Sequence, residues 1–245
     1  MSTSSGGRRI LIIVPTYNER ANIESFLHAL LATLPEANVL VVDDNSPDKT
    51  GELVDALAKQ DTRIHALHRA GKLGLGTAYI EGFNWGIERG YDWFFEMDAD
   101  FSHDPKYLQD FVAALENGAD VVVGSRNIEG GRVEGWGIGR QLISKGGSLY
   151  ARTALGVGVH DLTTGYKAFT RETLEGLNLR DVKSTGYGFQ IEMTFRALRR
   201  ERKVVEVPIV FVDRRAGQSK MSTRIFMEAL LVVWKLRWDA VVGRL

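Results

Sequence analysis

Short β-rich runs alternate with amphipathic helical patterns along the first half of the chain. Turn residues and then a helical pattern follow each run; the runs are residues 10–14, 39–42, 64–67, 93–97 and 121–123. The clearest helical pattern begins at Ile23, and its apolar residues recur at helical spacing as far as Leu34. This alternation predicts βαβ units with right-handed crossovers, and therefore a Rossmann-like α/β fold whose mostly parallel sheet is flanked by helices.

Length and composition narrow the class of protein. A chain of 245 residues with 44% apolar residues and a formal net charge of zero fits a single α/β domain with a sizeable core. Balanced charge gives no global field that would favour nucleic acid or an anionic membrane, so any anion site must come from local clusters. The absence of Cys excludes disulfides, thiolate nucleophiles and Cys-ligated zinc. The longest apolar run near the C-terminus, residues 229–234, is far shorter than the roughly 18 residues of a membrane span, so we expect a protein on the cytoplasmic side.

The second half of the chain has a different pattern. Beyond Gly124 a Gly- and Arg-rich stretch covers residues 125–140. Four further elements are expected: a helix at 141–155, a strand at 166–169, a helix at 189–200 and a strand at 204–212. No interdomain linker is visible, so we expect a disordered tail at 1–9 and one domain at 10–220, in which the second half extends the same sheet.

Residues 221–245 predict a C-terminal amphipathic helix. Four of its charged residues fall within about 60° of one another at 100° per residue: Arg224, Glu228, Lys235 and Asp239. The wide apolar face that remains either packs on the core or forms an interfacial helix or partner-docking surface. In the interfacial case Trp234 and Trp238 would lie at the level of lipid headgroups.

Two carboxylates end the apolar run 93–97. Asp98 and Asp100 are two residues apart, so in an extended chain their side chains point the same way and can converge on one hard cation such as Mg²⁺ or Mn²⁺, which in turn binds phosphate oxygens. The alternative is an acidic turn that caps a helix starting near Pro105. Polar clusters also follow the first two strands, at 15–19 and 43–48, and in a parallel sheet ligands bind beyond these strand ends. Convergence of three such ends favours the cation and diphosphate site.

Other polar segments allow two readings each. Asp44 is either a base- or ribose-recognising carboxylate or part of a turn before a helix capped by Thr50. The loop at 71–76 lacks the spacing of a dinucleotide fingerprint or a P-loop, so it is either an ordinary turn or a flexible loop that brings Arg69 and Lys72 near a diphosphate.

Basic residues in Gly-containing loops form two clusters. Arg126 and Arg140 flank residues 130–136, and a second cluster occupies residues 213–220. Each is either a solvated loop or a phosphate clamp, and the acidic site favours the clamp. The five histidines, including His103, show no ligand spacing with one another, so neither zinc nor a Ser-His-Asp triad is indicated.

Taken in order, these pieces resemble the dolichol/polyprenol-phosphate mannose synthases, which are inverting family 2 glycosyltransferases with the glycosyltransferase A fold. The resemblance covers nearly the whole chain. It rests on eight motifs: VPTYNE (14–19), VDDNSPD (42–48), KLGLGTAY (72–79), MDADFSH (97–103), GSR (124–126), DLTTGY (161–166), GYGFQIE (186–192) and RRAGQSK (214–220).

The resemblance implies transfer of mannose from GDP-mannose to a polyprenyl or dolichyl phosphate with Mg²⁺ or Mn²⁺. It implies a nucleotide-sugar half at 10–124 and an acceptor half at 125–220. The nucleotide sugar is expected to contact Pro15, Tyr17, Glu19, Val42, Asp44, Lys72, Asp98, Ala99, Asp100, Arg126, Arg214 and Lys220. The acceptor phosphate is expected to contact Arg126, Arg140, Ser144 and Ser219, and the metal Asp98, Asp100 and Ser102. Asp100, Arg126, Arg140 and Arg214 are the expected catalytic residues. Some relatives carry Gln where this chain has Ser102, so the third protein ligand stays open.

The nucleophile in such a reaction is a phosphate oxygen, which attacks the anomeric carbon with inversion. A phosphomonoester with a second pKa of about 6 is already largely dianionic at neutral pH, so the reaction needs positive side chains that align two anions more than it needs a strong base. Many relatives carry C-terminal transmembrane helices; this chain is expected to reach its lipid by peripheral binding, through a membrane-anchoring partner, or through a segment outside this sequence. The alternatives are a UDP-sugar polyprenyl-phosphate glycosyltransferase for glucose or an aminosugar, nucleotidyl transfer, and a non-catalytic nucleotide- or lipid-binding module.

Overall fold

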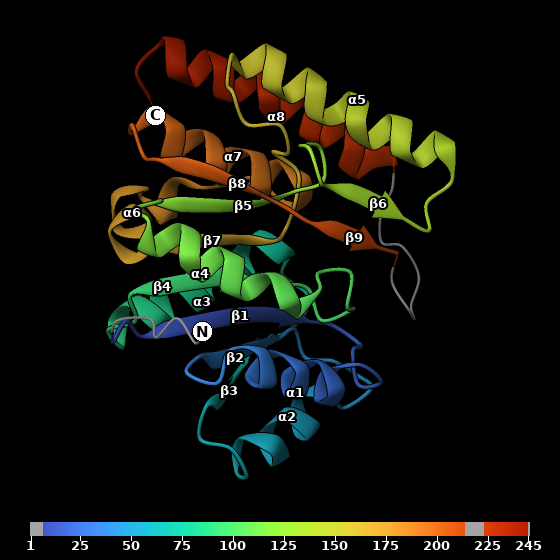
Figure 1. Ribbon diagram of the computed structural model, residues 1–245, viewed down its shortest axis with the longest axis vertical. Coiled ribbons are helices and arrows are strands. Elements are labelled where there is room, and N and C mark those ends of the chain that lie inside the picture. Colours follow the sequence, from blue (N-terminus) through green and yellow to red (C-terminus); the bar gives the residue numbers. More distant parts are fainter. Residues whose placement is uncertain (1–6, 214–222, 245) are drawn as a thin grey trace.

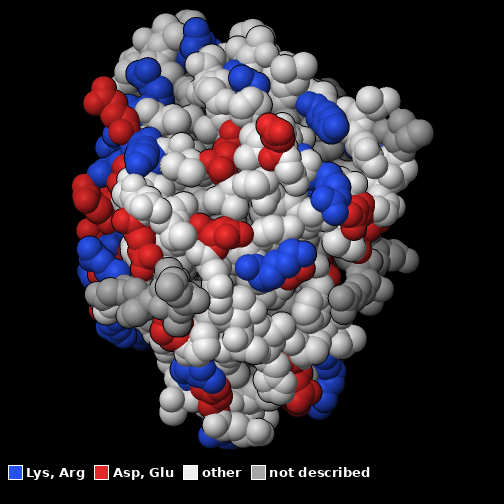
Figure 2. All heavy atoms as spheres, in the orientation of Figure 1, with Lys and Arg blue, Asp and Glu red and all other residues white. Residues whose placement is uncertain are grey.

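The computed structural model describes residues 7–213 and 223–244, except for the side chains of Ile138 and of residues 223–230 (Figure 1). The expected roles of Arg214, Ser219 and Lys220 therefore lie outside the described residues. Figure 2 shows Lys and Arg interspersed with Asp and Glu over the face that it draws, which agrees with a formal net charge of zero.

A seven-stranded sheet runs through the described part of the chain, in the order β3-β2-β1-β4-β7-β5-β8. The strands are β1 (Ile10–Thr16), β2 (Asn38–Asp43), β3 (Ile64–His68), β4 (Trp93–Glu96), β5 (Val121–Ser125), β7 (Lys167–Thr170) and β8 (Val204–Pro208). Neighbouring strands pair in parallel except β7, which is antiparallel to both β4 and β5. The mostly parallel sheet is confirmed, and the reversed strand between β4 and β5 is a feature that the sequence pattern did not predict.

Helices cover both faces of this sheet. They are α1 (Ile23–Thr33), α2 (Thr50–Ala58), α3 (Leu75–Glu88), α4 (Leu108–Glu116), α5 (Ile138–Leu155), α6 (Arg171–Gly176), α7 (Gly186–Arg199) and α8 (Thr223–Val241), with short 3₁₀ turns at Pro105–Tyr107 and Leu179–Asp181. Side chains alternate along β1: Ile10 and Ile12 pack with α1, α2 and α4, whereas Leu11 and Ile13 pack with α3, α6 and α7. Both faces of the strand are buried, which explains its continuous apolar sequence.

The predicted strand at 204–212 is two strands. β8 ends at Pro208 and pairs with β5, whereas β9 (Val210–Val212) pairs with β6 (Arg132–Glu134) in a separate small sheet. Pro208 has no N–H to continue the ladder, and the chain leaves the main sheet after Ile209 donates to the carbonyl of Ser125 (3.0 Å). The small sheet brings part of the Gly- and Arg-rich stretch beside the strand ends.

Two predicted caps are assigned differently by the structure. Helix α2 begins at Thr50, but the capping carboxylate is Asp48, whose Oδ1 accepts from the Thr50 N–H (3.0 Å). The turn at Pro105 is capped by Asp104, which accepts from Lys106 N (3.0 Å). Since Asp104 performs this task, the two carboxylates at 98 and 100 are not the caps of this segment.

The C-terminal helix packs beside α5 and over α7 at one end of the molecule (Figure 1). Val233 and Leu236 are buried in a cluster with residues of α5 and α7, while Trp234 and Trp238 are 61% and 64% exposed. One side of the helix therefore packs on the core, as one reading expected, and the other side is exposed. No helix in the described ranges is long and apolar enough to span a bilayer.

Candidate active site

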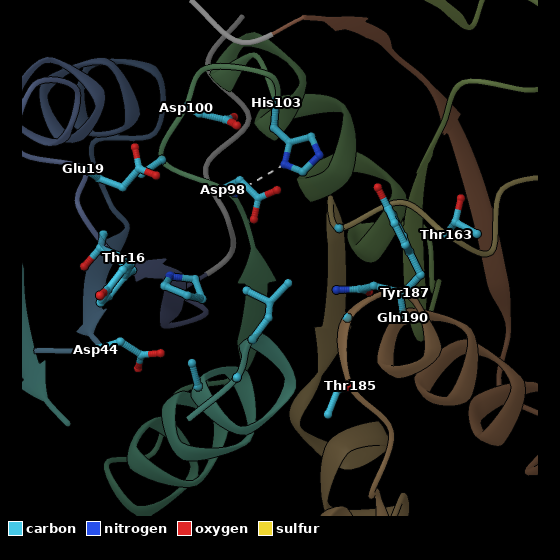
Figure 3. Close-up of a pocket in the computed structure, with 18 of the residues that line it drawn as sticks. Thr16, Glu19, Asp44, Asp98, Asp100, His103, Thr163, Thr185, Tyr187 and Gln190 are labelled. Atoms are coloured by element: carbon cyan, nitrogen blue, oxygen red, sulfur yellow. Dashed lines mark hydrogen bonds between the residues drawn. The ribbon is translucent and has the colours of Figure 1, made fainter. Parts of the chain in front are cut away.

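A cavity of about 440 Å³ lies beyond the carboxyl ends of β1, β2 and β4. Ten of the expected site residues line it: Pro15, Tyr17, Glu19, Asp44, Lys72, Asp98, Ala99, Asp100, Arg126 and Arg140. Figure 3 shows Glu19, Asp44, Asp98 and Asp100 on one side of the space and Thr163, Thr185, Tyr187 and Gln190 on the other. The first group comes from the first half of the chain and the second from the second half, so both halves build one site.

Three of the expected residues that the structure describes do not line the cavity. Val42 is fully buried within β2 and packs in the core. Ser102 is 2% exposed, and its Oγ is buried without a hydrogen-bond partner in the described structure. Ser144 lies one turn beyond Arg140 on α5. Their expected contacts with donor, metal and acceptor stay predictions.

The adjacent carboxylates Asp43 and Asp44 have different surroundings: Asp43 binds neighbouring loop residues, and Asp44 lines the cavity. Asp43 accepts from Thr16 Oγ1 (2.8 Å) and from the Ser46 N–H (2.9 Å), which ties the loop after β2 to the end of β1. Asn18 N donates in turn to Ser46 Oγ (3.0 Å). Asp44, whose N–H donates to the Thr16 carbonyl (3.0 Å), is left facing the cavity.

Arg69 is the buried partner of Asp44. Its side chain is 1% exposed, and Nη1 lies 2.9 Å from Asp44 Oδ1 while Nε lies 3.3 Å from Glu81 Oε1. Burial raises the pKa of Asp44, and Arg69 opposes that rise. Of the two basic residues expected near a diphosphate, only Lys72 lines the cavity; Arg69 faces inward because it balances two carboxylates.

His103 and Ser102 make hydrogen bonds within the D-x-D segment. The Asp98 N–H donates to His103 Nδ1 (3.3 Å), and Asp100 Oδ1 accepts from the Ser102 N–H (3.0 Å). Burial lowers the pKa of His103 to about 4 against the opposing effect of Asp100, so the ring is neutral at neutral pH. With Nδ1 as acceptor, the ring proton lies on Nε2. Sequence reasoning set His103 aside because it compared histidines only with each other; its position three residues after Asp100 was the available signal.

Asp98 and Asp100 fit a hard divalent cation. Two carboxylates supply oxygen ligands of the kind that Mg²⁺ and Mn²⁺ take, and such ions commonly complete their shell with substrate phosphates and water. No group of three or more His, Cys, Asp or Glu arranged to hold a metal occurs within the described ranges. The chain therefore fits a cation that binds together with a diphosphate better than a permanently caged ion.

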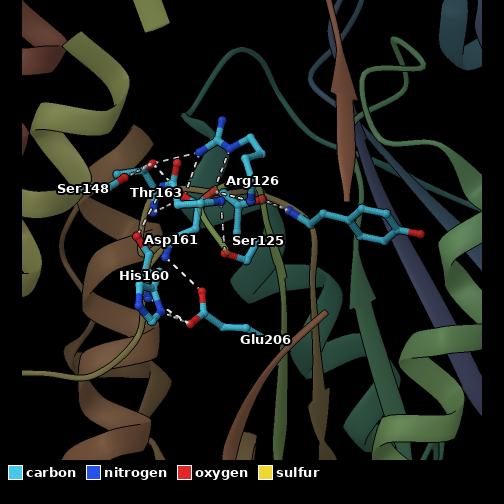
Figure 4. A network of polar contacts seen from close by, with 10 residues as sticks. Ser125, Arg126, Ser148, His160, Asp161, Thr163 and Glu206 are labelled. Atoms are coloured by element: carbon cyan, nitrogen blue, oxygen red, sulfur yellow. Dashed lines mark hydrogen bonds and ion pairs between the residues drawn. The ribbon is translucent and has the colours of Figure 1, made fainter. Parts of the chain in front are cut away.

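A buried ion pair holds Arg126 in the opposite wall (Figure 4). Its Nε and Nη2 donate to the two carboxylate oxygens of Asp161 (2.7 and 2.8 Å), and Nη2 also donates to Thr163 Oγ1 (3.0 Å). Burial alone would raise the pKa of Asp161, but Arg126 holds it below its usual value. Glu206 on β8 accepts from the N–H groups of His160 and Asp161, which fixes the segment that carries the carboxylate.

Arg140 reaches the cavity from α5 with fewer constraints. Its guanidinium carbon lies 3.9 Å from the ring centroid of Trp136, and Nη1 lies 3.2 Å from Asp213 Oδ1. The side chain is 31% exposed, compared with 6% for Arg126. One arginine of the wall is thus fixed and the other is partly hydrated.

Solved structures identify the class of fold. The chain matches glucosyl-3-phosphoglycerate synthase from Mycobacterium tuberculosis with a TM-score of 0.70 and 20% identity, over 96% of this chain and 81% of that one. It matches the mannosyltransferase PcManGT from Pyrobaculum calidifontis, solved with GDP-Man and Mn²⁺, with a TM-score of 0.57 and 16% identity, over 99% and 76%. These likenesses establish the glycosyltransferase A fold that the motifs implied.

Sequence comparison then gives the family. Residues 11–177 match the protein family described as "Glycosyl transferase family 2". The chain is 48% identical to an undecaprenyl-phosphate mannosyltransferase of Micrococcus luteus (97% of this chain, 99% of the relative) and 48% identical to a polyprenol monophosphomannose synthase of Mycolicibacterium smegmatis (94% and 88%). It is 35% identical to a dolichol-phosphate mannosyltransferase of Pyrococcus furiosus (97% and 66%). The chain belongs to glycosyl transferase family 2.

Proposed function

We propose that the protein transfers mannose from GDP-mannose to a polyprenyl phosphate, with inversion, using Mg²⁺ or Mn²⁺. The observation that carries this proposal is a single cavity that places Asp98 and Asp100 opposite Arg126 and Arg140. The first pair suits a metal-bound diphosphate, and the second pair suits an incoming phosphate. The names of the three relatives support mannose transfer to a lipid phosphate, and the structure of PcManGT with GDP-Man and Mn²⁺ supports the donor. The lipids differ in name, so the lipid of this chain is left as a polyprenyl phosphate.

The cavity divides the reaction between its two walls. Asp44 lies at the end suited to the nucleoside, and Asp98 and Asp100 would hold the cation. The cation, when bound, neutralises charge on the departing diphosphate. An acceptor phosphate oxygen forms a bond to the anomeric carbon while the bond to the β-phosphate oxygen breaks, and GDP leaves. Arg126 and Arg140 align the acceptor phosphate, whose charge makes a strong general base unnecessary.

We further propose that α5 and α8 dock on the membrane that contains the lipid acceptor. Large apolar side chains on these two neighbouring helices are more than half exposed: Leu142, Ile143, Leu149, Leu231, Trp234, Trp238 and Val241. Exposed Lys145, Lys235 and Arg237 lie among them and suit anionic headgroups. Because Arg140 is also on α5, this apolar face is continuous with the wall expected to receive the acceptor phosphate.

Nucleotide binding tests the donor assignment. In the presence of Mn²⁺ we expect GDP and GDP-mannose to raise the melting temperature more than UDP and UDP-glucose at equal concentration, because a ligand that binds only the folded state stabilises it. Removal of the metal with EDTA should reduce the shift. A larger shift with the uridine nucleotides would replace GDP-mannose with a UDP-sugar donor.

A further inference from the structure

The Gln190 side chain lines the cavity with its hydrogen-bonding capacity unfilled. It lies in α7, is 2% exposed, and neither its Nε2 nor its Oε1 makes a hydrogen bond of normal geometry with the described residues. Figure 3 shows this amide pointing into the space opposite Asp98. A buried amide without partners is unfavourable in the isolated protein, so its retention at a cavity wall indicates a ligand that supplies them.

The main chain of Gln190, in contrast, is anchored. Lys167 Nζ donates to the Gln190 carbonyl (2.6 Å), and Lys167 stands opposite Glu96 in the pairing of β7 with β4. Glu96 is fully buried; burial raises the pKa of its carboxyl to about 7, and Lys167 and the neighbouring Gln190 amide both oppose that rise. The buried pair therefore fixes the backbone of Gln190, and the amide lies both near Glu96 and at the cavity wall.

Gly165 leaves an open space beside this amide. A Cβ at position 165 would lie 3.8 Å from Asp98 Oδ2, 3.8 Å from Gln190 Nε2 and 3.5 Å from His103 Cε1. These are ordinary van der Waals distances, and the φ angle of Gly165 is not in the left-handed region, so the backbone does not require glycine here. The missing side chain instead keeps the space between the expected metal ligand and the amide free.

We propose that Gly165 and Gln190 form the subsite for the hexose of the nucleotide sugar. The inference rests on the proposed function, because a sugar joined to a diphosphate at Asp98 and Asp100 must lie beside these carboxylates. Gly165 gives the ring room, and the Gln190 amide donates to one sugar hydroxyl and accepts from another. Gln190 is thus a donor-binding residue that discriminates the nucleotide sugar from the bare nucleotide.

The steric half of the proposal is tested with Gly165→Ala. Gly176→Ala is the control, because a Cβ there meets Arg202 at a similar 3.5 Å but lies away from the cavity. With Mn²⁺ present, we expect Gly165→Ala to bind GDP as the wild type does and to bind GDP-mannose about tenfold or more weakly. Unchanged GDP binding shows that the metal site is intact. Equal binding of GDP-mannose by wild type and Gly165→Ala would overturn the proposal.

The hydrogen-bonding half is tested with Gln190→Met, which keeps the length of the side chain and removes the amide. We expect a melting temperature no lower than that of the wild type and unchanged GDP affinity, with GDP-mannose affinity and kcat/KM about fivefold to tenfold lower. Exposed Gln60→Met is the control. A lower melting temperature together with equal losses of GDP and GDP-mannose affinity would indicate a structural role and refute the assignment. Unchanged GDP-mannose affinity and kcat/KM would also refute it. If the wild type binds UDP and UDP-glucose better than the guanosine nucleotides, the binding of UDP and UDP-glucose by the same variants is measured instead. An error in the donor assignment is then distinguished from an error in the sugar subsite.

Discussion

The two walls of the cavity hold their charged groups in different ways. On the wall from the first half, the partners lie within the same loop: the Asp98 backbone N–H donates to His103 Nδ1, and the Asp100 carboxylate accepts from the Ser102 N–H. On the wall from the second half, Arg126 is locked to a buried carboxylate brought from a distant segment, while Arg140 stacks on Trp136 and stays partly hydrated. A local turn thus suffices to present carboxylates to a cation, whereas a buried cation needs a partner supplied by the fold.

The largest expected effect is on the acidic wall. Asp100→Ala removes one of the two carboxylates suited to the cation, so we expect turnover to fall by about a thousandfold or more even at saturating metal. Turnover is measured as GDP release. Asp104→Ala, which removes a carboxylate that caps the next turn, is the control. Near-normal turnover in Asp100→Ala would refute the metal assignment.

On the opposite wall, Asp161→Asn breaks the buried ion pair. We expect the free energy of unfolding to fall by about 3 kcal/mol, because Arg126 stays buried without its charged partner. Asp213→Asn should cost less than about 1 kcal/mol, because its partner Arg140 is partly hydrated. Urea unfolding measures both. Equal losses in the two variants would remove the distinction between a fixed and a hydrated arginine.

The same ion pair predicts acid sensitivity. The pKa of Asp161 is lower in the folded protein than its ordinary 3.8, so the pair's stabilisation is fully present above about pH 4 and is lost as the pH falls below that value. Stability measured from pH 6 to pH 3 should therefore fall less steeply in Asp161→Asn than in the wild type. Parallel curves would show that Asp161 does not contribute to acid unfolding.

Arg140→Ala separates binding from transfer. We expect GDP affinity to stay within about twofold of wild type and the transfer rate to fall by about ten- to a hundredfold, because the acceptor phosphate loses one aligning cation. Arg132→Ala is the matched control: Arg132 comes from the same Gly-rich stretch but pairs with Glu134 and does not line the cavity. Unchanged transfer in Arg140→Ala would remove this residue from the site.

The smallest expected effect concerns the apolar face of α8. We expect Trp234→Ala to weaken binding to vesicles that contain anionic lipid by about fivefold, because an interfacial aromatic ring is lost. Gln60→Ala, at an exposed position away from α8, is the control for co-sedimentation. Equal vesicle binding by wild type and Trp234→Ala would count against docking through this face.

Sequence reasoning found the fold because periodicity is a local signal. The alternation of apolar runs and helices fixes the layers, and the strand ends then fix where Asp44, Asp98 and Asp100 meet. The direction of β7 was not predictable in this way, because the sequence of its four residues does not indicate which strands it pairs with. Long-range partners were missed for the same reason: Asp161 with Arg126, and Asp44 with Arg69, become visible only when the chain is folded.

The adjacent pair Asp43 and Asp44 shows the limit most clearly. Both are carboxylates at the end of one strand, and no composition or spacing argument separates them. Strand alternation puts them on opposite sides of the backbone, and only the position of Thr16 and Ser46 shows that Asp43 holds the loop while Asp44 faces the cavity.

The most direct test of the central claim is a transfer assay. Purified protein is incubated with radiolabelled GDP-mannose, Mg²⁺ or Mn²⁺ and a polyprenyl phosphate, and the label extracted into organic solvent is counted. If one cavity binds the donor at Asp98 and Asp100 and the acceptor at Arg126 and Arg140, we expect lipid-soluble label that requires both the cation and the acceptor. The label should be lost in Asp100→Ala and reduced in Arg140→Ala. Verified GDP binding without any label in the organic phase, in the presence of all components, would contradict it.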